Sequence, residues 1–237
     1  MREWNPMAEN AEQIAYYRIK TAIYKQYIRQ GSRLAEASLA KQLNLSRTPV
    51  RHALRRLNYE GLVEFSPNGR AQVICPTENK IRQTYAVRAQ LEKMAAALAA
   101  QYATQKDVAE LKLLVAEESP VYQKFIESGL RHGLSEYHEL NETFHLRIAK
   151  LSGNEVLYEQ IDGLFQKCRI YLILFDTYDQ MDFNPSPMAS PMEHEEIISR
   201  LSNGDSQGAE EAMLNHLNST LDGMDFDIVL PNDRITL

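Results

Sequence analysis

The sequence predicts a mainly α-helical protein of two domains, with three helices and a β-hairpin in residues 1–76 and an all-helical bundle in residues 77–237. Apolar residues recur at helical spacing through most of the chain, and the clearest strand-like runs lie before residue 76. Pro76 and Thr77 interrupt the pattern, and 237 residues suffice for one small and one medium domain.

The distribution of charge also divides the chain at this point. Residues 1–76 hold 12 Lys and Arg against 6 Asp and Glu, whereas residues 77–237 hold 14 against 26. A basic head on an acidic body suits a polyanionic partner at one end only. The acidic body argues against a protein that coats nucleic acid along its whole length.

The first domain is organised around two short helices joined by a tight turn. Leu39, Ala40 and Leu43 give the first of these helices one apolar face, and Asn44 and Leu45 turn the chain. A further helix over residues 11–28 precedes the pair.

The second helix of the pair combines an apolar back with a basic front. Ser46 is placed to cap it, and Pro49 falls in its first turn, where the missing N–H does little harm. Arg47, Arg51 and Arg55 drift only about 40° per step and line one outward stripe. The residues that must face a core are Val50, Ala53, Leu54 and Leu57. This pattern is typical of a recognition helix in a DNA major groove, and the alternative is a solvated surface helix.

Two short strands follow and complete a winged helix-turn-helix. Residues 62–65 and 71–74 are predicted strands, and Ser66, Pro67, Asn68 and Gly69 form the turn between them.

These residues carry a family resemblance over about residues 15–75. The segments are Ser46-Arg47-Thr48-Pro49-Val50-Arg51, Ala53-Leu54-Arg55-Arg56-Leu57 and Glu60-Gly61-Leu62-Val63. They resemble the signature of GntR-family bacterial transcription regulators. At the wing, Gly69 lies four residues before Val73, and Arg70 takes the usual place of the family glycine. The residues expected to contact DNA are Ser46, Arg47, Thr48, Arg51, Arg55, Gly69 and Arg70.

The second domain is predicted to be helical throughout. A long helix follows residue 78, with an inner side that includes Ile81, Tyr85, Arg88, Leu91, Met94, Ala95 and Leu98. Further helices are expected over residues 105–118, 121–130, 133–151 and 154–175. After a loop over residues 176–189, the segment Ser190-Pro191-Met192-Glu193 is a predicted capping box that starts the next-to-last helix.

Four polar residues of this domain lie beside apolar stripes and are candidates for a metal site. Asn141 and His145 are one helical turn apart, and His194 and His216 lie in the last two helices. Imidazoles with an oxygen donor suit zinc, nickel or a similar divalent ion. The alternative is that each is an ordinary hydrogen-bonded core residue. His132 and His138 lack such framing and are expected at the surface, outside the set.

A second resemblance covers about residues 78–222. The segments are Asn141-Glu142-Thr143-Phe144-His145, Ser152-Gly153-Asn154, Glu193-His194-Glu195-Glu196-Ile197, Gly204-Asp205 and His216-Leu217. They resemble the FCD effector domain of the FadR-type branch of the family. That domain commonly binds a metal through an Asp or Asn four residues before a His and two histidines about 22 apart, the spacing of His194 and His216. Asn141 stands where many members have Asp.

The resemblance also implies a small carboxylate effector beside the metal. Arg88 matches a family arginine and is the first candidate for its cation, with Arg169 as a second. Arg88 could equally pair with Glu92 one turn on at the surface.

The sequence therefore favours a bacterial DNA-binding regulator, a repressor controlled by an organic acid, that binds a palindromic operator of double-stranded DNA as a homodimer. One alternative is a regulator for which the metal is itself the signal. A second is a metallohydrolase with Glu142 or Glu195 as general base. Two cysteines, no signal peptide and no membrane-length apolar run predict a cytoplasmic protein.

Overall fold

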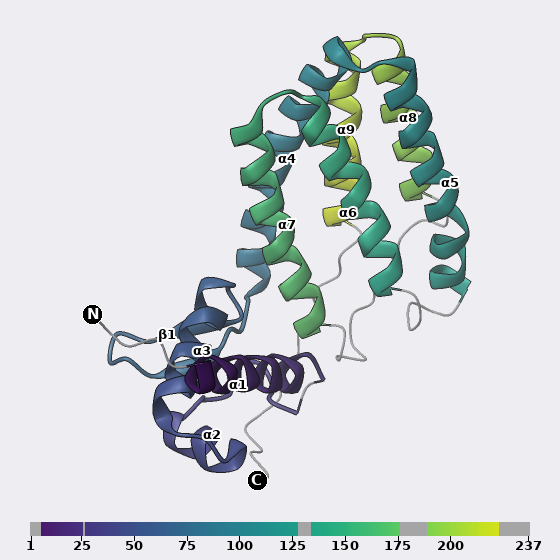
Figure 1. Cartoon of the computed structure of the whole chain (residues 1–237). Coiled ribbons are helices and arrows are strands. Elements are labelled where there is room, and N and C mark those ends of the chain that lie inside the picture. The colour runs from purple at the N-terminus through teal and green to yellow at the C-terminus, as the bar shows by residue number, and fades with distance from the viewer. Residues whose placement is uncertain (1–5, 26, 128–133, 176–188, 223–237) are drawn as a thin grey trace. The chain divides into compact units, whose positions relative to one another are not determined.

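The computed structural model describes residues 6–25, 27–127, 134–175 and 189–222 (Figure 1). Contacts divide the chain into two compact units. The N-terminal unit contains Met1–Thr77 together with Gln166–Thr177, and the helical unit contains Glu78–Phe165 together with Tyr178–Leu237. The predicted loop over residues 176–189 and the last residues of the chain lie almost wholly outside the described residues.

Before residue 78, the described part of the N-terminal unit contains three helices and a two-stranded sheet. The elements are α1 (Pro6–Tyr24), α2 (Glu36–Leu43), α3 (Arg47–Tyr59), β1 (Val63–Phe65) and β2 (Ala71–Val73). As expected, the four apolar residues of α3 are buried: Val50, Ala53, Leu54 and Leu57 are each 0% exposed. They pack with Ile19 and Ile23 of α1, so α3 is held from behind and its other side faces outward. The fold is the predicted winged helix-turn-helix.

The turn between α2 and α3 uses a left-handed residue. Asn44 has φ 55° and ψ 44°, a conformation that asparagine tolerates better than most residues, and it ends α2. Ser46 occupies the N-cap position of α3 with extended backbone, but its hydroxyl makes no capping hydrogen bond. The expected cap is therefore wrong in its side chain although right in its position.

The wing is an antiparallel hairpin with the pairs Val63–Val73, Glu64–Gln72 and Phe65–Ala71. Its turn closes through the Gly69 N–H, which donates to the Ser66 carbonyl at 2.8 Å. Gly69 has φ 74°, a backbone conformation that side-chain-bearing residues rarely adopt. Arg33, before α2, forms an additional bridge to Gln72 that the sequence did not indicate.

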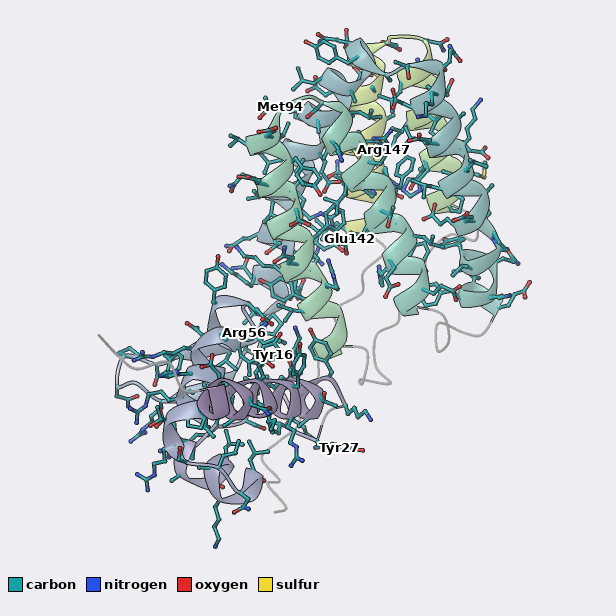
Figure 2. The ribbon with its side chains drawn as sticks, viewed as in Figure 1. Tyr16, Tyr27, Arg56, Met94, Glu142 and Arg147 are labelled. Atoms are coloured by element: carbon teal, nitrogen blue, oxygen red, sulfur yellow. The ribbon has the colours of Figure 1, made fainter. Side chains whose placement is uncertain are left out.

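A polar cluster joins α1 to the end of α3 in the same unit. The Arg56 guanidinium stacks over the Tyr16 ring with 3.8 Å to its centre (Figure 2). Glu60 accepts hydrogen bonds from the Tyr16 hydroxyl at 2.8 Å and from Lys20 at 2.9 Å. The two helices are therefore fixed by directional contacts as well as by their apolar faces.

Among the described residues, the helical unit comprises five whole helices and the first part of a sixth, up to Phe165. These helices run beside one another (Figure 1). Their bounds are α4 (Glu78–Tyr102), α5 (Gln105–Glu127), α6 (Leu134–Leu151), α7 (Glu155–Phe175), α8 (Ala189–Ser202) and α9 (Ser206–Asp222). The helices pack through the contacts α4–α9, α8–α9, α5–α6, α4–α6 and α5–α8, and the buried apolar residues of the bundle form several clusters. Arg147 on α6 ties that helix to α5 through Asp107 at 2.8 Å (Figure 2).

One residue expected on the inner side of α4 lies outside. Met94 is 47% exposed, whereas Arg88 and Ala95 are buried. Six residues at 100° per residue place Met94 about 120° around the helix from Arg88, so it cannot share that face.

The expected break between two helices near residue 120 is also wrong. α5 continues through Pro120 without interruption. Proline lacks the N–H that would reach the Ala116 carbonyl, but Ala116 and Pro120 are both exposed, so that carbonyl lies on the wet side of the helix. The buried residues Val115, Glu118 and Tyr122 keep the helix in register on both sides of the proline.

We predict that Pro120→Ala stabilises the helical unit by about 1–2 kcal/mol. The substitution restores one helical hydrogen bond, and the greater freedom of the unfolded chain offsets part of the gain. Urea unfolding of the full chain, followed by circular dichroism, measures the change. Glu117→Ala at a nearby exposed position is the control and should shift the midpoint little. A lower midpoint for Pro120→Ala would show that the helix requires proline there.

Candidate metal centre and DNA-binding surface

Three histidines from three helices converge inside the helical unit. His145 lies on α6, His194 on α8 and His216 on α9, and each is at most 2% exposed. The His216 Nε2 lies 3.2 Å from the His145 Nε2 and 3.3 Å from the His194 Nε2. The structure thus brings together three of the four residues for which the sequence predicted a shared ion.

A glutamate holds the outer nitrogen of each ring. The contacts to Nδ1 are made by Glu92 with His145 at 2.6 Å, Glu118 with His194 at 2.7 Å and Glu193 with His216 at 2.8 Å. Such carboxylates fix the orientation of an imidazole and raise its basicity as a ligand. Glu193 was expected to cap α8, but α8 begins at Ala189, and Glu193 contacts α9 instead.

The electrostatics of the cluster follow from its burial. Burial lowers the pKa of His145 to about 4 against the opposing effect of Glu92, and it lowers the pKa of His194 as well. Burial would raise the pKa of Glu92, but Arg88 and His145 hold it at about 2. Burial raises the pKa of Glu118 to about 7. The hydrogen bond between Glu118 and His194 needs one proton, which either the carboxyl group or the imidazole can carry.

Two of the separations among the three Nε2 atoms, 3.2 and 3.3 Å, fit two ligands of one divalent ion. Ligands about 2.0–2.1 Å from a metal lie about 2.8–3.0 Å apart at octahedral angles and about 3.3–3.4 Å apart at tetrahedral angles. Within the described residues, the Asn141 side chain makes no hydrogen bond, and it lies half-buried one turn before His145 on α6. Its amide oxygen is a competent fourth donor.

Arg88 lies in the interior of the unit. Its Nε donates to Glu92 Oε1 at 2.7 Å, and the two side chains are 3% and 2% exposed. The guanidinium also stacks on the Phe165 ring at 3.8 Å. The alternative of a surface pair with Glu92 was therefore right in its partner and wrong in its environment.

The remaining candidate residues of this domain differ in their exposure and location. His138, expected at the surface, is half-buried with an enclosed Nε2, and burial together with the nearby Arg88 lowers its pKa to about 4. His132 lies outside the described residues. Arg169 is exposed on the part of α7 that groups with the N-terminal unit. Glu195 is exposed and Glu142 half-buried.

The outward face of α3 presents the predicted DNA-binding residues. Ser46, Arg47, Thr48, Arg51 and Arg55 are all exposed. Among the described residues, Arg47 and Arg55 pair with no carboxylate. Gly69 and Arg70 are exposed at the wing.

Arg51 pairs with a carboxylate of its own unit. It makes a two-pronged ion pair with Glu36 at the start of α2, with 2.9 Å from Nε to Oε1 and 2.8 Å from Nη2 to Oε2.

Sequence reasoning missed the carboxylates that orient these groups. Glu36, Glu118 and Glu193 were not proposed for either site, and Glu92 entered only as a surface partner. A usable signal existed for Glu92, which lies four residues after Arg88 on the inner face of α4. Nothing in the local sequence distinguishes Glu118 from the other acidic residues of α5.

The chain combines a winged helix-turn-helix that has an arginine face with an all-helical domain that contains a histidine cluster. This combination defines a DNA-binding transcription regulator. The signature "Bacterial regulatory proteins, gntR family" matches residues 11–73, and the FCD domain matches residues 83–219. The chain belongs to the GntR family of bacterial transcription regulators, in the branch with an FCD domain. This family consists of regulators and not of enzymes, so the metallohydrolase alternative is wrong.

Curated relatives agree with this assignment. The chain is 35% identical to the Nta operon transcriptional regulator of Aminobacter aminovorans over 60% of its own length and 64% of that protein, slightly under two thirds. It is 25% identical to the HTH-type transcriptional repressor RspR of Escherichia coli over 90% of this chain and 88% of that one.

Solved structures share the fold. E. coli McbR/YncC superposes with a TM-score of 0.58 at 23% identity, covering 92% of this chain and 97% of that one. A putative GntR regulator from Rhodococcus sp. RHA1 gives 0.58 at 21% identity, covering 90% and 96%. Within the described residues, no helix combines the length and apolarity needed to cross a membrane.

We predict that Arg88→Leu destabilises the helical unit by about 3–5 kcal/mol, because it leaves Glu92 buried without its cation. The double variant Arg88→Leu/Glu92→Leu should be more stable than the single one, since it removes the unpaired charge. Chemical unfolding of wild type and both variants provides the measurement. A double variant as unstable as Arg88→Leu would show that packing, not charge, causes the loss.

Proposed function

We propose that this regulator is a repressor that binds a palindromic operator as a homodimer and responds to a small carboxylate at a metal site. His145, His194 and His216, with Asn141, would hold the ion, with zinc or nickel as the best candidates. A bound ion would supply Lewis acidity and positive charge at the point where the three rings converge.

The observation that carries the metal proposal is the convergence of three buried Nε2 atoms, on rings that each have a glutamate carboxylate at Nδ1. When Nδ1–H donates to a carboxylate, the Nε2 of the same neutral ring carries a lone pair. The Nδ1 atoms of His194 and His216 hydrogen-bond to Glu118 and Glu193, and their Nε2 atoms lie 3.3 Å apart. Two such lone pairs repel each other unless a proton or a metal ion lies between them. One proton would satisfy two of the three nitrogens, whereas a divalent ion would satisfy all three.

The burial of the cluster favours a resident ion over a sensed one. All three ligands are at most 2% exposed, and Phe144 stacks on the His194 ring at 4.0 Å. A metal-sensing regulator is the second candidate. Removal and return of metal alone, at fixed DNA and without effector, distinguishes the two because only a sensor changes its DNA affinity.

Glu92 provides the route by which an effector and the ion would influence each other. Its Oε1 contacts Arg88 and its Oε2 contacts His145. A carboxylate bound at Arg88 would compete with Glu92 and so change the support of His145. This coupling can be no larger than the effector's differential affinity for the two states. Arg169 stays a weaker candidate for the effector cation.

The dimer and palindrome follow from the size of the reading element. One recognition helix contacts only a few base pairs, and two copies related by a two-fold axis match two half-sites. The name of RspR, a repressor, supports the proposed sign of regulation.

We predict that His145→Ala loses most of its divalent-metal affinity and lowers thermal stability while DNA binding remains. Asn141→Asp should bind metal more tightly, because it adds a negative donor to a neutral set. Zinc and nickel titration by calorimetry compares wild type with both variants. His52→Ala, on the exposed side of α3, is the histidine control and should bind metal like wild type.

Two results would contradict the metal proposal. Wild type that binds neither ion would leave the three histidines as polar core residues. His145→Ala that binds as well as wild type would place any ion elsewhere.

We predict that Arg51→Ala weakens binding to a selected duplex by about 1–3 kcal/mol and relaxes its sequence preference. The duplex is selected by wild type from a randomised pool, and affinities are compared with a random duplex at one salt concentration. Arg18→Ala removes an exposed arginine of α1 and controls for net charge. Unchanged affinity of Arg51→Ala for the selected duplex would exclude a DNA contact by this residue.

A further inference from the structure

The Glu36 carboxylate occupies an unexpected place on a DNA-binding surface. It lies at the first residue of α2 and faces the arginine stripe of α3. We infer that Glu36 is a positioning residue that holds the Arg51 guanidinium in the orientation required to read a guanine. The inference rests on the proposed role of α3 in DNA recognition and assigns Glu36 a part in its specificity.

The atoms used by the ion pair leave the base-reading edge of Arg51 available. Arg51 Nε donates to both Glu36 oxygens at 2.9 and 3.1 Å, and Nη2 donates to Oε2 at 2.8 Å. Five N–H groups surround a guanidinium. The pair consumes Nε–H and one Nη2–H, so the Nη1 and Nη2 protons at the end of the side chain remain. That end is the edge that donates to O6 and N7 of guanine in the major groove.

The pair of hydrogen bonds from Nε and Nη2 to the Glu36 carboxylate, here called the fork, also restricts how the Arg51 side chain can move. A free arginine samples many rotamers and reaches phosphates as readily as bases. Two parallel hydrogen bonds fix the plane of the guanidinium and its distance from the α2 backbone. Arg51 can then donate in one plane only, which suits a base edge and not the variable positions of phosphate oxygens.

The local charge keeps Glu36 ionised for this task. The hydrogen bond from Arg51, and further the charges of Arg47 and Arg55, lower the pKa of the Glu36 carboxyl. One carboxylate thus lies among three arginines, of which it pairs with a single one.

A purely structural role accounts poorly for this placement. Exposed ion pairs contribute little to folding stability, and the Glu36 and Arg51 side chains are 30% and 49% exposed. A carboxylate near DNA also repels phosphates and lowers affinity for every sequence. Its loss should therefore affect specificity and general affinity in opposite directions, which a helix-stabilising acid would not do.

The test uses the full-length protein and a pool of duplexes with a randomised core. Glu36→Gln keeps the size of the side chain and removes its charge. Glu12→Gln is the matched control, because Glu12 pairs with the adjacent α3 residue His52 and is similarly exposed at 36%. Arg51→Lys keeps the charge of Arg51 but cannot make the fork. Bound duplexes are sequenced, and affinity for one random duplex is measured in parallel.

We expect wild type and Glu12→Gln to enrich guanine at one position of each half-site. In each of Glu36→Gln and Arg51→Lys, the enrichment of guanine at that position should fall about tenfold. Affinity of Glu36→Gln for the random duplex should stay equal or rise. Full guanine preference in Glu36→Gln overturns the inference and leaves DNA recognition by α3 intact. A wild type without any sequence preference overturns the proposed function itself. Melting curves of each variant establish that the lost preference is not loss of fold.

Discussion

The helical unit depends on one electrostatic arrangement, the convergence of three buried imidazole nitrogens through contacts of 3.2 and 3.3 Å. Most buried polar groups in proteins have a polar partner. The outer nitrogen of each ring contacts a carboxylate, and Glu92 in turn pairs with Arg88. Four helices, α4, α6, α8 and α9, are linked in this way, and Glu118 adds α5. The position of each helix is therefore set by directional contacts as well as by apolar packing.

In the N-terminal unit the charged side chains lie at the surface, where apolar packing does not fix their orientation. Its apolar core fixes the back of α3, and the basic side chains on the front have to be arranged by what surrounds them. Arg51 is paired with Glu36, whereas Arg47 and Arg55 pair with no carboxylate among the described residues. One arginine of the stripe is therefore held in place, and the other two are not. An equally spaced stripe in sequence is not an equivalent set in three dimensions.

Most of the fold was predictable because its elements repeat with a clear period. The apolar positions of α3, the turn at Asn44 and the hairpin all follow from local sequence. The failures occurred where tertiary contacts override local signals. Pro120 did not end α5, because buried residues on either side hold the helix together, and Glu193 serves α9 instead of capping α8.

The convergence of the three histidines was predictable, whereas the glutamates that contact them were not. The three histidines could be foreseen as neighbours from their apolar flanks and from family resemblance. Their supporting glutamates could not, since acidic residues are common on helices and only the bundle determines which ones point inward.

The buried histidine cluster also bears on how long the protein survives in a cell. With an ion bound only by the folded chain, the population of unfolded molecules falls as free metal rises. Without the proposed ion, the lone pairs of neutral rings would repel one another, and the folded state would be less favoured. Proteases act on the opened state, so small changes in stability alter abundance several-fold. Metal supply would then set the number of regulator molecules in a cell, independently of any signal that the regulator reads.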